Sequence, residues 1–219
     1  MSRVGSRLSA EKNGLYPVFL KLGGRRCLVV GAGKRAEERI PTLLECGAAV
    51  TVVAPAATSR IQLWARAQKL VWNRRRFESQ DLDDIWLCVV ATDSEGVNRS
   101  IFEESHSRRI LCNVVRDGIY SNFYYPAVVR RGPLQIAVST AGHSGALAQR
   151  LREELEFQFG PEWERWLRWL GEARSSLYDD PLSPRQRRTL LRKLASRKAQ
   201  DAFFRRWGVL PKNAKREKP

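Results

Sequence analysis

Glycines and a small residue stand at fixed spacing in segment 27–36, where four apolar residues lead into the expected start of a helix. Gly31 permits a tight turn, Gly33 lets the backbone approach a ligand, and Ala36 leaves room for close helix–strand packing. The first turn of such a helix offers unpaired N–H groups and a positive dipole end, which together bind an anion. The pattern is typical of a dinucleotide pyrophosphate site and predicts a nicotinamide cofactor, although a cramped strand–helix connection needs the same glycines.

The position that usually tells NAD from NADP holds no acid in this chain. A carboxylate about 20 residues after the glycines commonly binds the ribose 2′-hydroxyl of NAD. Here the corresponding segment reads Val53-Ala54-Pro55-Ala56. The choice between the two cofactors is therefore open at this position, and Arg60 could favour a 2′-phosphate.

Short apolar runs alternate with helical patterns up to about residue 115, and this rhythm predicts an α/β fold with a doubly wound, parallel Rossmann sheet. The runs are almost continuously apolar, as burial on both faces of a sheet requires. We expect strands at 27–30, 50–54, 70–72, 86–91 and 110–115, and helices at 35–46, 59–69 and 97–108.

After residue 115 the pattern changes to a hairpin followed by helices. Two apolar runs, 123–129 and 134–138, flank Arg130-Arg131-Gly132-Pro133, a turn sequence. Residues 141–145 then lead into a helix that Gly160-Pro161 ends. An aromatic stripe at helical spacing further along predicts a core or dimer contact. It consists of Trp163, Trp166, Leu167 and Leu170.

Composition narrows the class of protein. At 219 residues and 43% hydrophobic, the chain can bury a core, and it has no apolar stretch long enough to span a membrane, so a soluble cytoplasmic protein is expected. The four cysteines form no Cys-x-x-Cys pair, which argues for buried, reduced thiols and against a zinc site. Of the net charge of +16, residues 183–219 supply most, with 13 Lys and Arg against two acids.

Several short segments follow one another in a characteristic order and spacing. They are Tyr16-Pro17-Val18-Phe19-Leu20, the Gly31 turn, Val52-Val53-Ala54-Pro55, Ala91-Thr92-Asp93 with Val97-Asn98, Asn113-Val114-Val115 and the segment 130–140. In this order and spacing the chain resembles the precorrin-2 dehydrogenase and sirohydrochlorin ferrochelatase family, the siroheme synthase module. The resemblance covers about residues 15–175.

The resemblance implies an NAD-dependent homodimer that oxidises precorrin-2, a polycarboxylate tetrapyrrole, to sirohydrochlorin. Some members then insert ferrous iron. It also implies a Rossmann NAD-binding domain, expected at 15–115, a dimerisation and substrate region at 116–150 and a helical domain at 151–210. Their polar, basic composition makes 1–14 an expected flexible segment and 211–219 an expected disordered tail.

Site residues follow from the same resemblance. The implied cofactor contacts are Gly31, Gly33, Lys34, Arg35, Pro55, Ala56, Thr92 and Asp93. A helix cap is an equal interpretation of Thr92-Asp93. Because the substrate carries many carboxylates, its site should offer cations and a helix start. The implied substrate contacts are Asn113, Arg116, Arg130, Arg131, Thr140, His143 and Ser144, although the two hairpin arginines would also suit a solvated turn.

The proposed base differs from the family pattern. Loss of a hydride from the macrocycle must be matched by loss of a proton, which a carboxylate can accept. Many family members place two acids after Asn-Val-Val, but this chain reads Arg116-Asp117. A guanidinium stays protonated, so Arg116 could clamp a carboxylate but not act as base, and Asp117 is the candidate. Asp117 before Gly118 also suits a turn.

The later turn departs from the family pattern as well. It reads Ala141-Gly142 and Ser144-Gly145 where the family commonly has Gly-Gly and Ser-Pro. His143 is an outside candidate for proton exchange. With only two histidines and no ligand spacing around them, no protein metal site is assigned.

Two other classes of function stay open. The Arg116 substitution would suit a catalytically silent relative that binds nucleotide or tetrapyrrole. Alternatively, the basic C-terminal helix could bind nucleic acid or an anionic membrane, or simply pack across a dimer. Its cations are Arg187, Arg188, Arg192, Lys193, Arg197 and Lys198 around Leu190, Leu191 and Leu194.

Overall fold

The computed structural model describes residues 14–208, which form two compact units that divide after Tyr124. Each unit is described by itself. The expected flexible segment 1–14, apart from Gly14, and the expected tail 211–219 lie outside the described residues.

The first unit is built on a six-stranded sheet with the order β3-β2-β1-β4-β5-β6. Five strands are parallel, and β6 is antiparallel to β5. This order is that of the Rossmann fold and confirms the predicted doubly wound sheet. The strands are β1 Arg26–Val30, β2 Ala49–Val53, β3 Val71–Asn73, β4 Leu87–Val90, β5 Leu111–Val114 and β6 Asp117–Ser121.

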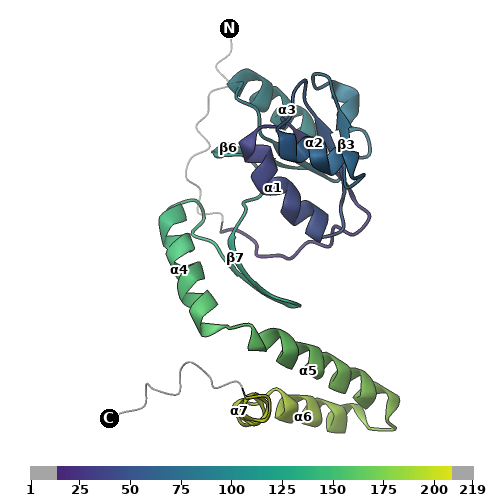
Figure 1. The fold of residues 1–219 in the computed structure, drawn as a ribbon, viewed down its shortest axis with the longest axis vertical. Coiled ribbons are helices and arrows are strands. Elements are labelled where there is room, and N and C mark those ends of the chain that lie inside the picture. Colours follow the sequence, from purple (N-terminus) through teal and green to yellow (C-terminus); the bar gives the residue numbers. More distant parts are fainter. Residues whose placement is uncertain (1–13, 209–219) are drawn as a thin grey trace. The chain divides into compact units, whose positions relative to one another are not determined.

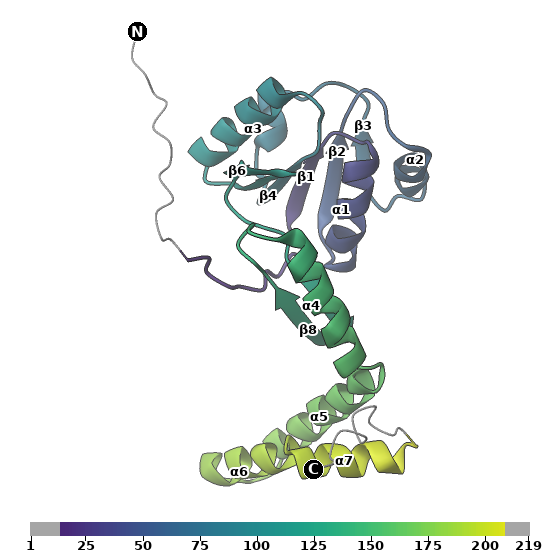
Figure 2. The same ribbon diagram turned by 90° about the vertical axis from the view of Figure 1, so that its left-hand side faces the viewer.

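Helices cover both faces of this sheet, with α1 and α2 on one side and α3 on the other (Figures 1 and 2). Their bounds are α1 Lys34–Glu45, α2 Ser59–Arg66 and α3 Glu95–Ser107, with a 3-10 turn, η1, at Ser79–Leu82. All four residues of β4 are buried, as the unbroken apolar runs predict for a central strand. The core on one face draws on Leu28, Val30, Val53, Leu82, Ile85, Cys88, Val90, Ile101, Ile110, Cys112 and Val114.

Strand β6 is absent from the sequence-based expectation. Arg116 adopts φ of 69° in the tight turn after β5, and Asp117 then pairs with Val114. The side chain of Asn122 completes the pairing, since its Oδ1 accepts from the Cys112 N–H at 2.8 Å. Residues 117–121, which the sequence analysis groups with the second region, thus extend the first sheet. Their two apolar side chains, Ile119 and Tyr120, are adjacent, so the segment lacks the alternation that would predict a strand.

The second unit begins with the predicted hairpin, β7 Ala127–Arg131 and β8 Leu134–Val138, which turns through Gly132 at φ of 56°. Four helices follow, α4 Gly145–Gln158, α5 Glu162–Asp179, α6 Pro184–Leu194 and α7 Arg197–Arg206. The ring centroids of Trp163 and Trp166 lie 5.3 Å apart, and each lies 6.2 Å from the ring centroid of Phe204. Trp166 is buried and the rest of the stripe is half-buried, so the stripe contributes to the core of this unit, one of its two expected roles.

The structure tests two expectations from composition, that the thiols are buried and reduced and that no segment spans a membrane. All four cysteines are free thiols, of which Cys27, Cys88 and Cys112 are buried and Cys46 is half-buried. Burial raises the pKa of the Cys27 thiol to about 11. Among residues 14–208, no helix has both the length and the apolar character needed to cross a bilayer.

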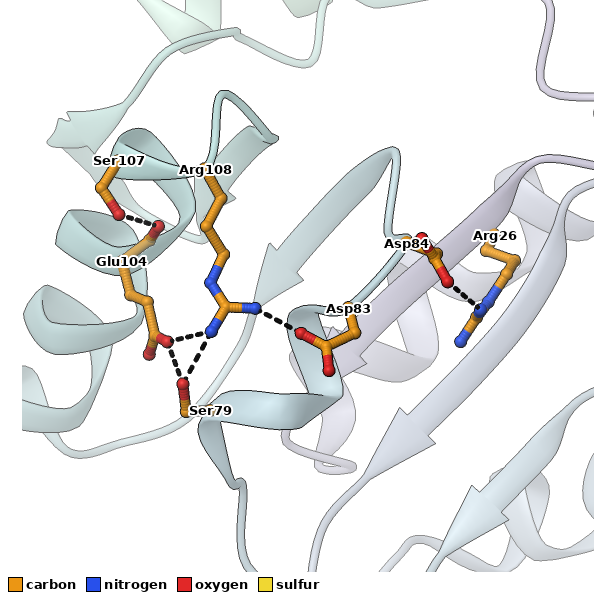
Figure 3. A network of polar contacts seen from close by, with 7 residues as sticks. All are labelled: Arg26, Ser79, Asp83, Asp84, Glu104, Ser107 and Arg108. Carbon is orange, nitrogen blue, oxygen red and sulfur yellow. Dashed lines mark hydrogen bonds and ion pairs between the residues drawn. The ribbon is translucent and has the colours of Figure 1, made fainter.

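A polar network fastens the end of α3 to η1 (Figure 3). Arg108 donates to Asp83 Oδ1 at 2.6 Å, to Glu104 Oε1 at 2.7 Å and to Ser79 Oγ at 2.8 Å. Helix α3 leads into the amino end of β5, so this network holds the edge of the sheet opposite to the carboxyl ends of the strands. The same edge carries Asp84, which pairs with Arg26 at 3.4 Å.

Candidate functional site

The carboxyl ends of four parallel strands, β2, β1, β4 and β5, lie side by side at one edge of the first sheet, the carboxyl edge. The Gly31 N–H donates to Val53 O at 3.0 Å, the Ala91 N–H to Val30 O at 2.8 Å, and the Val115 N–H to Val90 O at 2.9 Å. The strand order reverses between β1 and β4, and open α/β sheets bind their ligands at such a point.

A cavity of about 890 Å³ opens at this point. It is lined by Val30, Gly31, Ala32, Gly33, Val53, Ala54, Pro55, Ala56, Arg76, Phe77, Ala91, Thr92, Asp93, Ser94, Gly96, Val97, Ser100 and Ile101. Six of the expected cofactor residues are among them. Lys34 and Arg35 are not, but Arg35 reaches the site indirectly, through an ion pair with Asp93 at 3.1 Å.

The glycine turn fits a dinucleotide. Gly31 has φ of 97°, and a Cβ there would stand 2.6 Å from Ala91 O. Gly33 is the N-cap of α1, with no side-chain cap, and a Cβ on it would meet nothing within 4 Å. The first N–H groups of α1 are thus uncovered toward the cavity, which is the arrangement that a pyrophosphate requires.

Across the cavity, Thr92 is held in place by Asn98. The Thr92 hydroxyl and Asn98 Oδ1 lie 2.5 Å apart, and Asn98 Nδ2 donates to Thr92 O at 3.2 Å. The N-cap of α3 is Ser94, without a side-chain hydrogen bond to the helix. Of the two caps expected for this helix, Asp93 or Ser94, the structure has Ser94, so Thr92 and Asp93 are not the cap. A second open helix N-terminus thus borders the cavity.

One wall of the cavity escaped the sequence analysis. Arg76 and Phe77 follow β3, and Val97, Ser100 and Ile101 come from α3. The available signal was the run Arg74-Arg75-Arg76-Phe77 directly after the third apolar segment. The α3 residues gave none, because their spacing is that of any helix face packed on a sheet.

The middle arginine of this run fixes its position. Arg75 donates to both carboxylate oxygens of Asp81, at 2.6 and 2.8 Å, and the Glu78 N–H donates to Asp81 at 2.9 Å. Burial by itself would raise the pKa of Asp81, but these hydrogen bonds and the charge of Arg75 outweigh it and hold the pKa below its ordinary value. The Arg75–Asp81 pair therefore anchors the segment that carries Arg74 and Arg76.

We expect Asp81→Asn to destabilise the first unit at neutral pH but not in acid. A carboxyl group whose pKa is lower in the folded chain stabilises the fold above its unfolded pKa of about 3.9, and this stabilisation is lost as the pH falls through the folded value. Urea unfolding of both proteins should show a gap in the free energy of unfolding at neutral pH, and this gap should narrow as the pH falls below the unfolded pKa of Asp81. Asp84→Asn is the matched control, because the Asp84 side chain is 86% exposed and pairs with Arg26 only at 3.4 Å, so the substitution should change little. A gap that persists in acid would contradict this account.

The candidate base lies in the β5–β6 turn. Asp117 is half-buried, and its Oδ1 accepts from the N–H groups of Ile119 at 2.9 Å and Tyr120 at 3.3 Å. Asp117 thus forms a turn, as the alternative interpretation predicts. These bonds use only Oδ1, so its second carboxylate oxygen takes no part in them. It comes two residues after Val115, on the β5 side of the carboxyl edge, and Arg116 beside it is exposed.

Asn113, an expected substrate contact, is occupied within the protein. Its side chain is buried, and Nδ2 donates to Phe123 O at 2.9 Å and to Ser121 Oγ at 3.3 Å. The amide therefore holds the chain where it leaves the first sheet.

The expected substrate residues of the second unit divide into two groups. The Arg131 guanidinium donates to the carbonyl oxygens of Phe159 at 2.8 Å, Arg130 at 2.8 Å and Glu156 at 3.2 Å, so it ties the hairpin to the end of α4. Within the described residues, the Arg130 side chain has no ion-pair partner, which leaves it available to a ligand.

The loop before α4 is closed by its own side chains. The Thr140 hydroxyl donates to Ser144 O at 2.9 Å and accepts from the Ser144 N–H at 3.2 Å, and Ser144 Oγ caps α4 through the Leu147 N–H at 3.1 Å. Ala141 has φ of 50°, where glycine would be unstrained. His143 is exposed in this loop.

Comparisons with known proteins agree with this geometry. A family model described as NAD(P)-binding matches residues 18–127, and one described as sirohaem biosynthesis protein central matches residues 131–158. The chain is 39% identical to siroheme synthase from Xylella fastidiosa over 166 residues, 75% of this chain and 35% of that protein. It is 38% identical to siroheme synthase 2 from Klebsiella pneumoniae over 178 residues, 81% of this chain and 39% of that protein.

The chain thus spans well under half the length of these curated relatives. A solved structure titled SirC, precorrin-2 dehydrogenase, is matched over nearly its whole length. The match has a TM-score of 0.73 and 31% identity, and it covers 88% of this chain and 98% of the other. The glycine turn, the sheet order and these matches together show that the chain belongs to the precorrin-2 dehydrogenase family.

Proposed function

We propose that this chain oxidises precorrin-2 to sirohydrochlorin with NAD as the hydride acceptor. The observation that carries the proposal is the cavity at the point where the strand order reverses, between β1 and β4. There Gly31 lies against the Ala91 backbone, and the uncapped N-termini of α1 and α3 border the cavity. When bound there, the nicotinamide supplies the hydride acceptor. The full-length match to a protein titled precorrin-2 dehydrogenase supports the choice of substrate.

The roles of the protein's own residues follow from their places along the carboxyl edge. The N–H groups of α1 bind the pyrophosphate, and Thr92, positioned by Asn98, lines the part of the cavity toward β4 and β5. Asp117 accepts the proton that balances hydride loss. Arg116 binds a carboxylate of the macrocycle. In the second unit, Arg130 offers the same kind of anion contact.

The protein acts as a homodimer in this proposal. Tyr16, Phe19 and Ile119 expose 87%, 66% and 74% of their surface in the single chain. The β7–β8 sheet has only two strands, so a further strand could pair with its edge. A second copy would cover these apolar side chains and extend this sheet. The four free thiols suit a reducing compartment, so we place the reaction in the cytoplasm.

A single preparation tests the function. Precorrin-2 and NAD are added to the purified chain without oxygen, and absorbance follows both tetrapyrrole and NADH. We expect sirohydrochlorin and NADH to form in equal amounts. NAD binding without oxidation would instead identify a silent relative, the alternative that Arg116 favours. Ferrous iron added afterwards shows whether this chain also makes siroheme, the step for which the missing first acid matters most.

A further inference from the structure

A second, smaller cavity of about 320 Å³ adjoins the dinucleotide cavity, and both are lined by Ala56. Its other walls come from the loop after β2, from α2 and from β3 with the residue that follows Asn73. The lining residues are Ala56, Ala57, Gln62, Ala65, Arg66, Trp72 and Arg74. They include two cations and no acid, so an anion fits this recess.

The loop between β2 and α2 is held rigidly over the recess. Trp72 Nε1 donates to Ala54 O at 3.0 Å, and Gln62 Nε2 donates to Ala57 O at 2.9 Å. In the part of the chain that the structure describes, the N–H groups of Ala56 and Ala57 donate to no protein acceptor. The loop thus presents two backbone donors at the border of the two cavities.

Arg74 lies at the corner where the ribose is expected. The Ala54 N–H donates to Asn73 O at 3.2 Å, which places Arg74 next to the end of β2. Its guanidinium lies over the Trp72 ring, 5.9 Å from the centroid. Among residues 14–208, neither Arg74 nor Arg66 forms an ion pair with a carboxylate. Both cations are available to a ligand.

Arg60, which the sequence analysis considered for this role, is engaged elsewhere. It pairs with Glu37 at 3.6 Å and lies over the Trp64 ring at 5.1 Å, and it lines neither cavity. Arg75 is likewise held by Asp81. The two arginines that flank Arg75 do border a cavity: Arg74 lines the recess and Arg76 lines the dinucleotide cavity.

We propose that this recess binds the 2′-phosphate of NADP through Arg74 and Arg66, so that the chain accepts NADP as well as NAD. The inference rests on the proposed dinucleotide site and adds a cofactor specificity to it. In Rossmann folds a carboxylate at the end of the second strand favours a ribose 2′-hydroxyl, and a nearby arginine accommodates a 2′-phosphate. Here the carboxylate is absent and two arginines without carboxylate partners stand in its place.

Calorimetric titration of the full chain with 5′-ADP and with 2′,5′-ADP tests the recess without any turnover. We expect 2′,5′-ADP to bind about tenfold more tightly or better, with an advantage that shrinks as salt is added. Arg74→Gln should remove most of this advantage and leave the affinity for 5′-ADP unchanged. Lys69→Gln is the matched control, because Lys69 is an exposed cation between α2 and β3 that lines neither cavity.

The two proposals fail separately. Equal affinities for 5′-ADP and 2′,5′-ADP would overturn the proposed 2′-phosphate site and leave the proposed dinucleotide site intact. If neither nucleotide binds, the site on which both proposals rest is refuted. Arg74→Lys retains the charge and should keep part of the advantage of 2′,5′-ADP. It therefore still tests the recess if Arg74→Gln folds poorly. A thermal melt of each variant confirms folding.

Discussion

Gly31→Ala should weaken both the fold of the first unit and its affinity for NAD, whereas Gly33→Ala should weaken mainly the affinity. At Gly31 the added Cβ would meet Ala91 O at 2.6 Å and Ala91 C at 2.8 Å, both backbone atoms of the adjacent β4 edge that cannot swing away. The φ of 97° adds a second penalty for any L side chain. Overpacking and backbone strain together should lower the free energy of unfolding by about 3 kcal/mol.

Gly33 gives the matched comparison. Its φ is −83°, and a Cβ there enters open space, so alanine should cost about 1 kcal/mol or less as the N-cap of α1. The methyl group would nevertheless stand between the α1 N–H groups and a phosphate, and NAD affinity should fall about tenfold or more. Urea unfolding and NAD titration of both variants separate the two effects. Unchanged NAD affinity in Gly33→Ala would show that the pyrophosphate does not lie at this turn.

Asp117→Asn should lower kcat for precorrin-2 oxidation by about 10²- to 10⁴-fold, the usual contribution of a general base. The substitution is chosen because Asn keeps an Oδ1 that can accept from the Ile119 and Tyr120 N–H groups, so the β5–β6 turn should survive. The KM for NAD should not change, since Asp117 does not line the dinucleotide cavity.

Asp84→Asn serves as the control for Asp117→Asn. Its carboxylate is 86% exposed and pairs only weakly with Arg26, near the opposite edge of the sheet. It should leave kcat and stability nearly unchanged. If Asp117→Asn turns over precorrin-2 at the normal rate, Asp117 is a turn-forming residue alone, and another group or water takes the proton.

Much of the secondary structure in both units could be predicted because its signals are local. The apolar run before Gly31 predicts a strand buried on both faces, and β1 is buried in all positions but its first. The turn Arg130-Arg131-Gly132-Pro133 predicts the β7–β8 hairpin because Gly132 can take the positive φ that the turn needs. In each case the deciding atoms belong to residues a few positions apart.

Side-chain roles were less predictable where the partner is distant in sequence. Arg131 reads as a cation for substrate, but its donors are used by carbonyls at the end of α4. Asn113 belongs to the motif that carries the family resemblance, yet its amide bonds the chain 10 residues later. The sequence shows that such groups can donate hydrogen bonds, but not which acceptor the fold brings to them.

The sequence by itself determined the strand–helix rhythm, the glycine turn and the family, since these depend on local backbone preference and on the order of short motifs. Only the tertiary structure decided that Arg76 and Phe77 line the same cavity as Gly31, that Arg74 lines the adjoining recess, and that β6 joins the sheet. The physical reason is that strand order, which no single segment encodes, sets which carboxyl ends become neighbours. A binding site at that edge is assembled from all of them at once.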